Sequence, residues 1–201
     1  MAKNYERVCQ FKVSLKKISP VIWRRIQVPE TYTFWDLHVA IQDVMGWDDC
    51  HLHLFEIVNP ATDEKEKIGI PDEEEFDIND KTLPGWKQKI ARYFSKDNPK
   101  AGYLYDFGDN WGHEIKLEDI LPREKGVNYP VCVAGERACP PEDCGGIRGY
   151  QGFLEIIMNP SHERHEEMFT WVGGKFEPER FDMGKVCFDD PKKRWKQAFG
   201  S

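Results

Sequence analysis

Residues 128–152 restrict the fold of this chain more than any other stretch. They read NYPVCVAGERACPPEDCGGIRGYQG and contain three of the six cysteines, a Pro-Pro pair and a Gly-Gly pair. Proline removes a backbone donor and glycine weakens helices and strands, so irregular backbone is predicted throughout. A long irregular segment in a compact domain is usually a functional loop or a disordered one. The cysteines and flanking aromatic residues favour an ordered loop, which we call the Cys-rich loop.

The composition excludes several classes of protein. With 201 residues, 40% of them hydrophobic, the chain can bury a core. It has no apolar signal region and no run near the roughly 18 apolar residues of a membrane span, so a soluble protein without a membrane partner is expected. Six scattered cysteines are expected to be reduced thiols in the cytoplasm. The net charge of −7 weighs against a general nucleic-acid binder, but acidic residues concentrate between 63 and 80, which is compatible with a basic patch elsewhere.

Alternation of apolar and polar residues predicts antiparallel strands. They are expected near residues 6–16, 21–28, 51–58, 102–107 and 111–118. Turn residues at Ser19-Pro20 and Asp109-Asn110 join four of them into hairpins. Apolar residues at helical spacing predict helices near residues 33–45, 149–158 and 161–172. Because neighbouring strands form hairpins and do not alternate with helices, we predict a single α+β domain over residues 1–201, with about three helices packed on the strands.

The helix expected at residues 33–45 carries the clearest local signals. Thr33 and Asp36 have the spacing of a capping box, and Gly46 is placed to end the helix. His38 falls on the apolar stripe of this helix. It is therefore expected to be a buried histidine with hydrogen-bond partners, and not a ligand.

Two regions are expected to be elaborations of the domain. Residues 59–101 are rich in acidic residues and are predicted to be mostly solvated loop, with a short helix or strand at 86–94. Residues 176–201 are predicted to form a loop, a short strand or turn around 186–188, and a charged tail.

Carboxylates and imidazoles gather at the predicted turns and in the Cys-rich loop. Such groups, when they converge on one cleft, suit a divalent cation or acid–base chemistry. Two of the histidines stand two residues apart on one strand, where they can share a ligand or make hydrogen bonds at a sheet edge. The alternative role for the carboxylates is to form turns and caps. The candidate binding residues are His51, His53, Asp106, Asp109, Trp111, His113, Glu142 and Asp143.

Three cysteines of the loop region form a second candidate site. Cys132, Cys139 and Cys144, with spacing C-x6-C-x4-C, could hold a metal such as zinc together with His113. The spacing matches structural zinc sites only loosely. The alternatives are buried thiols, or one reactive cysteine that a neighbouring histidine activates.

Four sequence blocks, taken together, carry a resemblance to a known family. They are IWRR at 22–25, MGWDDCHLH at 45–53, YDFGDNWGH at 105–113 and CPPEDCGGIRGY at 139–150. This combination resembles the family named after the third open reading frame of a root-inducing plasmid, whose members are also similar to passenger proteins of insertion elements. The resemblance covers roughly residues 5–185, apart from 59–101, and implies an α+β domain. It carries over no activity, and the chain shows no serine- or tyrosine-recombinase signature.

Two functions are compatible with these residues. The favoured one is a non-catalytic binding module that presents the candidate residues to a protein or nucleic acid of a mobile element. Arg24, Arg25 and an exposed Trp111 would then contact phosphates and bases. The alternative is a metal-assisted hydrolase that uses the same carboxylates and histidines. Enzymatic activity stays open, and no residue is assigned a catalytic role.

The backbone of the Cys-rich loop gives one sharp expectation. A loop so rich in Pro and Gly makes few internal hydrogen bonds, so its buried amides and carbonyls need partners elsewhere. We expect residues 139–146 to pack against His51, His53 and the 106–113 hairpin, within about 8 Å of their side chains. The main polar cleft would lie there, walled by Tyr150 and Trp111.

Overall fold

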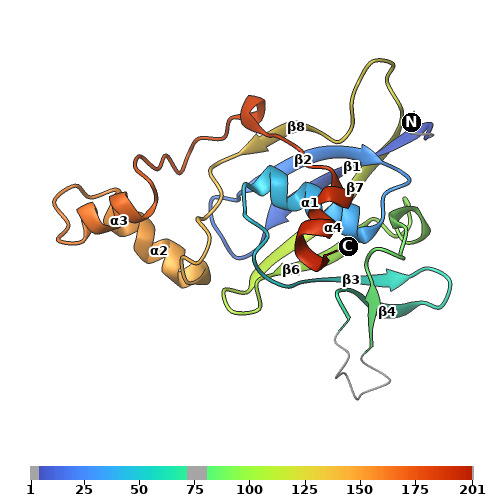
Figure 1. The fold of residues 1–201 in the computed structure, drawn as a ribbon, viewed down its shortest axis with the longest axis horizontal. Helices are drawn as coiled ribbons and strands as arrows, with labels where there is room; N and C mark the ends of the chain where they lie inside the picture. The colour runs from blue at the N-terminus through green and yellow to red at the C-terminus, as the bar shows by residue number, and fades with distance from the viewer. Residues whose placement is uncertain (1–4, 72–80, 201) are drawn as a thin grey trace.

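A single mixed sheet organises the chain in the computed structural model, which describes residues 5–71 and 81–200 (Figure 1). Its strands are β1 (Arg7–Leu15), β2 (Trp23–Pro29), β3 (His53–Asn59), β4 (Glu64–Gly69), β5 (Thr82–Pro84), β6 (Lys100–Tyr105), β7 (Trp111–Pro122) and β8 (Val131–Glu136). They lie in the order β5-β4-β3-β6-β7-β1-β2-β8. Every pair is antiparallel except β4 and β5, which run parallel. The predicted α+β class and the five predicted strands are confirmed.

Helix α1 (Phe34–Met45) packs its apolar stripe on one face of the sheet. The predicted capping box is present: the Thr33 hydroxyl accepts from the Asp36 amide at 3.1 Å, and the Asp36 carboxylate accepts from the Thr33 amide at 2.7 Å. Gly46 ends the helix at φ 83°, where a residue with a Cβ would be strained. Phe34 packs edge-on against Phe55 of β3 at 5.1 Å between ring centroids, which ties the helix to the sheet.

The acidic elaboration is more ordered than expected. β4 and β5 extend the sheet beyond β3, because the edge of β3 offers backbone groups that need partners. Ile68 of β4 is fully buried. The segment at 86–94 contains a 3-10 helix, η2 (Ile90–Arg92). The acidic run at 72–80 lies outside the described residues.

The Cys-rich loop is irregular over only part of its length. Its first third forms β8, which pairs with β2 from Gln27↔Val131 to Trp23↔Glu136. Its last residues begin α2 (Gly146–Ile157). The expectation of irregular backbone throughout is therefore wrong. The prolines lie at 130, 140 and 141, so the proline-free segment VCVAGE can pair with the edge of β2.

The C-terminal third forms two separate helical parts. Helix α2 and α3 (His165–Trp171) make a lobe beside the sheet, where helices were predicted at 149–158 and 161–172. The expected charged tail is instead a helix, α4 (Pro191–Phe199), which packs against α1. Asp190 caps it, and the Arg194 guanidinium bonds Asp43 at 2.7 Å. A 3-10 helix, η3 (Met183–Lys185), lies just before the predicted turn at 186–188.

Helices in the described part of the chain fall short of what a membrane span requires. None of them has both the length and the apolar character for a crossing.

Candidate functional site

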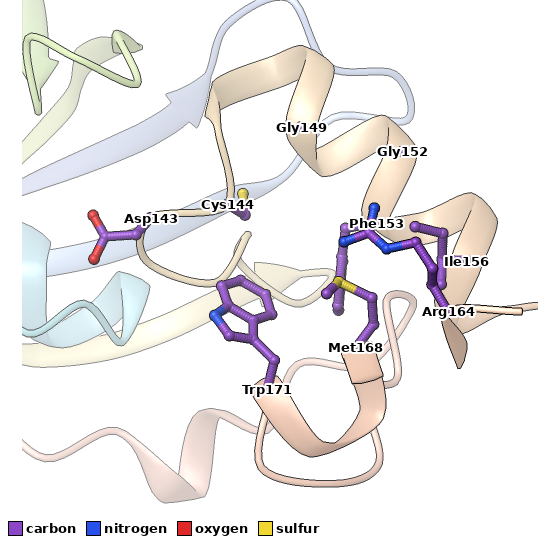
Figure 2. Close-up of a pocket in the computed structure, with 9 residues that line it drawn as sticks. All are labelled: Asp143, Cys144, Gly149, Gly152, Phe153, Ile156, Arg164, Met168 and Trp171. Atoms are coloured by element: carbon purple, nitrogen blue, oxygen red, sulfur yellow. The ribbon is translucent and has the colours of Figure 1, made fainter. Parts of the chain in front are cut away.

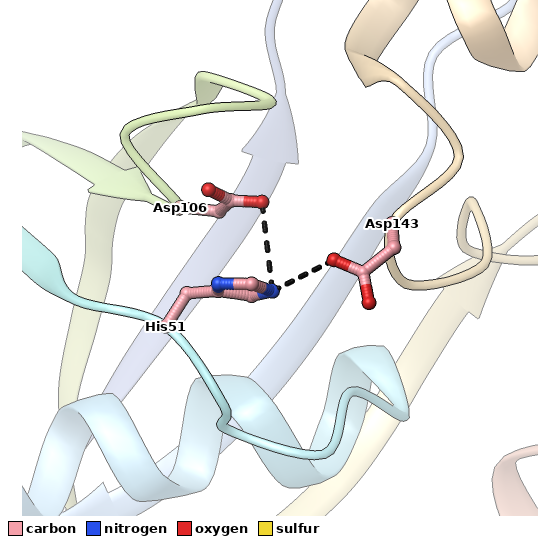
Figure 3. Close-up of side chains that lie close together, drawn as sticks. All are labelled: His51, Asp106 and Asp143. Atoms are coloured by element: carbon pink, nitrogen blue, oxygen red, sulfur yellow. Dashed lines mark hydrogen bonds and ion pairs between the residues drawn. The ribbon is translucent and has the colours of Figure 1, made fainter.

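Three of the predicted residues converge at one end of the sheet: His51, Asp106 and Asp143 (Figure 3). The His51 Nε2 lies 2.9 Å from Asp143 Oδ1 and 3.7 Å from Asp106 Oδ2. One ligand atom from each residue lies within 4.8 Å of the other two. We call these three residues the His51 site. Among the described residues it is the one group of three or more His, Cys, Asp or Glu side chains gathered so closely.

The pairing of β3 with β6 explains why two of these residues meet. His53 is opposite Tyr105 in this antiparallel pair, so His51, just before β3, and Asp106, just after β6, emerge side by side. The Asp106 amide donates to the Leu52 carbonyl at 3.0 Å. Asp106 also uses Oδ1 to accept from the Gly108 amide at 2.8 Å, which leaves Oδ2 directed at His51.

Asp143 reaches the site because the Cys-rich loop docks there. The Glu142 carboxylate accepts from the Tyr105 hydroxyl and from the Asp48 amide, each at 2.9 Å. On the other side of Asp143, the Asp109 carboxylate accepts from the Gly145 amide at 3.0 Å. These contacts confirm that residues 139–146 pack against the His51 strand and the 106–113 hairpin. Glu142 and Asp109, two of the candidate residues, therefore position a third, Asp143.

Glycine at position 146 permits this close docking. A Cβ there would stand 2.4 Å from the Asp109 carbonyl oxygen, and its φ is +66°. Both conditions exclude larger residues without a local rearrangement. The predicted Gly-Gly pair thus has a definite role in bringing the loop to the hairpin.

The His51 site is polar, and its residues are exposed to different degrees. The side chain of His51 is 31% exposed, that of Asp106 10% and that of Asp143 72%. Burial lowers the pKa of His51, but the hydrogen bond to Asp143 and the charges of Asp106, Asp143 and Glu142 outweigh it and raise this pKa above its usual value. The site therefore favours a positive charge between the two carboxylates.

The other two candidate histidines belong to the core. His53 is buried and stacks on His38, with ring centroids 3.5 Å apart, so it does not share a ligand with His51. His113 is fully buried, and burial lowers its pKa to about 3. Carbonyls of Trp111 and Tyr103 offset this lowering in part. Neither ring nitrogen of His113 makes a hydrogen bond of good geometry with a described residue.

Trp111 and Arg24 are buried and not available to nucleic acid, so the expectation is wrong for these two residues. Trp111 is 1% exposed and packs against Trp47. Arg24 is also 1% exposed, donates to the carbonyls of Val44 and Glu136, and lies over the Phe181 ring at 3.7 Å. Arg25 pairs with Glu118 across the sheet. The face of β2 that carries Arg24 is buried, whereas the face that carries Arg25 is partly exposed, with the Arg25 side chain 31% accessible.

The three cysteines do not form a metal site with His113. Cys132, Cys139, Cys144 and His113 are all described, and no three of their ligand atoms lie together as those of the His51 site do. Cys132 instead donates to the Ala134 carbonyl at 3.5 Å. Burial raises the pKa of Cys144 to about 12 and that of Cys139 further, so both are thiols in the chain described.

A cavity of about 370 Å³ lies on the other side of residues 143–144, between α2 and α3 (Figure 2). Phe153, Met168 and Trp171 make it largely apolar, and the Asp143 carboxylate points away from Met168 and Trp171. Neither Tyr150 nor Trp111, the predicted walls, lines it. In place of the expected polar cleft there is a surface site and an adjoining, largely apolar cavity, and Asp143 belongs to both.

Sequence reasoning missed Tyr105, whose hydroxyl holds Glu142 in place. The signal was present in the alternation of YLYD, which puts Tyr103 and Tyr105 on one face of β6, and pairing with β3 puts that face beside His53. Asp49, two residues before His51, was also missed: its carboxylate bonds both His38 and Arg194. Arg194 is 145 residues away in sequence, in a segment that was expected to be a charged tail.

Known proteins share this sequence and fold. The family described as plasmid pRiA4b ORF-3-like protein matches residues 7–185. Uncharacterized protein y4hQ of Sinorhizobium fredii is 36% identical over 167 residues, which are 83% of this chain and 81% of that protein. The crystal structure of a protein of unknown function, MM3350 from Methanosarcina mazei Go1, has 50% identity and a TM-score of 0.84, and the match covers 92% of this chain and 99% of that one. The chain therefore belongs to the plasmid pRiA4b ORF-3-like protein family.

Proposed function

We propose that this chain is a binding module that holds a divalent cation at the His51 site and presents it to a partner. The observation that carries the proposal is the convergence of one imidazole nitrogen and two carboxylate oxygens within 4.8 Å, from three segments far apart in sequence. Around a tetrahedral cation about 2.1 Å from each ligand, neighbouring ligand atoms are about 3.4 Å apart, so a pair at the 4.8 Å limit must approach by about 1.4 Å, which side-chain rotation can supply.

The ligand types indicate which cation fits. An imidazole nitrogen beside two carboxylates suits zinc, manganese or iron better than magnesium or calcium, which prefer oxygen ligands alone. The raised pKa of His51 is consistent with a site that stabilises positive charge. A cation would take the place of the His51 proton between Asp106 and Asp143.

The residues behind the ligands support a preformed site. Glu142 and Asp109 fix the loop on both sides of Asp143, and the Gly108 amide orients Asp106. Contacts of this kind orient metal ligands and raise affinity. Three protein ligands leave coordination positions open, and a carboxylate or imidazole of a protein partner would complete them.

Calorimetric titration with Zn²⁺, Mn²⁺ and Mg²⁺, with elemental analysis of the purified protein, tests the cation. We expect one Zn²⁺ or Mn²⁺ per chain, and a loss of at least about 100-fold in affinity for His51→Ala and Asp143→Asn. The matched controls are His162→Ala and Asp97→Asn, which lie outside the site and should bind as the parent does. Stoichiometric binding that survives His51→Ala would overturn the proposal, as would no binding at all.

A metal-assisted hydrolase is the second candidate, and Glu142 favours it. Burial raises the pKa of this carboxyl, and its Oε2 is buried with no hydrogen-bond partner among the described residues. A carboxyl of this kind beside a cation site can exchange protons with a reacting group. Hydrolysis of bis-p-nitrophenyl phosphate and p-nitrophenyl acetate with Mn²⁺ or Zn²⁺ is the test. Turnover that Glu142→Gln leaves unchanged counts against this candidate.

We also propose a cytoplasmic location and an association with mobile elements. All six cysteines are free thiols, which supports a reducing compartment. The description of the family refers to a plasmid reading frame, which supports a role in mobile elements.

A further inference from the structure

A second cavity, of about 460 Å³, lies where α1 and α4 begin and residues 86–89 pass between them. Its volume is in the range of pockets that hold small molecules. It shares no residue with the His51 site. Three tryptophans and three lysines give its lining a distinct character: Trp35, Trp86, Trp195, Lys89, Lys192 and Lys196.

The tryptophans give the cavity flat apolar walls. Trp195 of α4 lies 4.6 Å from Trp86 and 5.1 Å from Trp35, measured between ring centroids. Trp35 is nearly buried, and its indole nitrogen donates to the Pro191 carbonyl at 3.0 Å, which fixes the start of α4. Trp86 and Trp195 are only half-buried. Their remaining ring surface is the kind on which planar aromatic molecules stack.

The lysines make the cavity positive in a chain of net charge −7. Lys192 and Lys196 are one helical turn apart on α4, both are exposed, and no acidic side chain of a described residue pairs with either. Lys89 donates to the Thr31 carbonyl at 2.7 Å. The one carboxylate in the lining, that of Asp36, accepts from the Thr33 amide as part of the α1 cap. The unpaired charge in the cavity is thus positive.

We propose that this cavity binds a small planar aromatic anion, a carboxylate or sulfonate, whose rings stack on Trp86 and Trp195. Its charged group lies near Lys192 and Lys196. The site is independent of the proposed cation, and failure of one leaves the other standing.

Fluorescence titration of the full chain with 8-anilinonaphthalene-1-sulfonate tests this inference. The expected result is one probe per chain with quenched tryptophan emission. The neutral analogue N-phenyl-1-naphthylamine should bind at least about tenfold more weakly, and the double variant Lys192→Gln, Lys196→Gln should weaken the sulfonate by about tenfold.

The matched control is Lys193→Gln, a lysine on α4 that does not line the cavity. It should bind the sulfonate as the parent does, and circular dichroism should show that both lysine variants are folded. Trp86→Ala should abolish one-to-one binding. The inference is overturned if the neutral analogue binds as tightly as the sulfonate, if Lys193→Gln weakens binding as much as the double variant, or if the double variant or Trp86→Ala leaves binding unchanged.

Discussion

Two histidine–aspartate groups involve the short segment between α1 and β3, which supplies Asp49 to one and His51 to the other, and they differ in burial and in pKa shift. In the first group His38 is fully buried, with Nδ1 2.8 Å from the Tyr103 hydroxyl and Nε2 2.7 Å from Asp49. In the second, His51 is 31% exposed and its Nε2 faces two carboxylates.

The pKa shifts of the two histidines have opposite directions. Burial lowers the pKa of His38 more than its bond to Asp49 raises it, whereas the carboxylates around His51 outweigh the effect of its lesser burial. In the first group both ring nitrogens of His38 have hydrogen-bond partners, and Asp49 also bonds Arg194 of α4. The second has carboxylate oxygens left over at the surface. The same two residue types therefore make a structural network in one place and a candidate binding site in the other.

The largest expected effect is on the buried group. His38→Ala removes both hydrogen bonds and leaves Asp49 and the Tyr103 hydroxyl with fewer partners, so the free energy of unfolding should fall by about 3 kcal/mol. Urea denaturation followed by tryptophan fluorescence measures it. His38→Gln should recover part of the loss. A cost for His38→Ala no larger than that of His51→Ala would show that the two groups are equivalent.

A smaller effect is expected for the arginine that joins α4 to this group. Arg194 bonds Asp43 at 2.7 Å and Asp49 at 3.2 Å, and the side chains of these aspartates are only 5% and 7% exposed. Arg194→Gln leaves both carboxylates without a countercharge and should cost about 2 kcal/mol. The matched control is Arg164→Gln, whose partner Glu167 lies on exposed α3 and which should have little effect. If both variants lose the same free energy of unfolding in urea, the ion pairs of Arg194 contribute no more than an exposed surface pair.

Acid should lower the stability of the fold, because the folded chain keeps buried histidines neutral. The pKa of His113 is lowered to about 3, mainly by burial, and that of His38 is lowered too. Below pH 6.5 the unfolded chain takes up protons that the folded chain does not, so stability is full above this pH and falls as the pH decreases toward 3. His113 contributes about 1 kcal/mol between pH 6.5 and 5.5.

Urea denaturation of His113→Leu across this pH range tests the sign. The variant should lose less stability on acidification than the parent, by the contribution of one histidine. If the two chains respond alike, His113 is not the neutral buried group that its surroundings indicate.

The sequence predicted much of the sheet and of the site because local patterns determine both. Alternation gave β1, β2, β3, β6 and β7, and the capping box gave the start of α1. Strand alternation singled out His51, and the residues of turns and loops singled out Asp106 and Asp143. The bond from the Gly145 amide to Asp109 agrees with the predicted need of a Pro- and Gly-rich loop for outside partners.

What could not be predicted depends on contacts between distant segments. A period of two puts His51, His53 and Phe55 on one face of a strand, but only the position of α1 decides that His53 is buried and His51 is not. In the same way, Arg24 is covered by Phe181. The C-terminal segment forms α4 because Arg194 bonds Asp43 and Trp195 packs on Trp35, both residues of α1. Local sequence patterns do not contain those partners.

The smallest expected change in stability is at the exposed group, and it separates the two groups most clearly when a cation is added. His51→Ala should alter the free energy of unfolding by less than about 0.5 kcal/mol without a cation, because the side chain of His51 is 31% exposed and that of Asp143, its hydrogen-bond partner, is 72% exposed. A cation that binds only the folded chain stabilises it by about 2.7 kcal/mol at a concentration 100 times its Kd. Thermal unfolding should therefore shift upward with Zn²⁺ or Mn²⁺ in the parent and in His162→Ala, but not in His51→Ala. An equal upward shift in His51→Ala would mean that the cation binds elsewhere, and that the two histidine–aspartate groups differ in exposure but not in function.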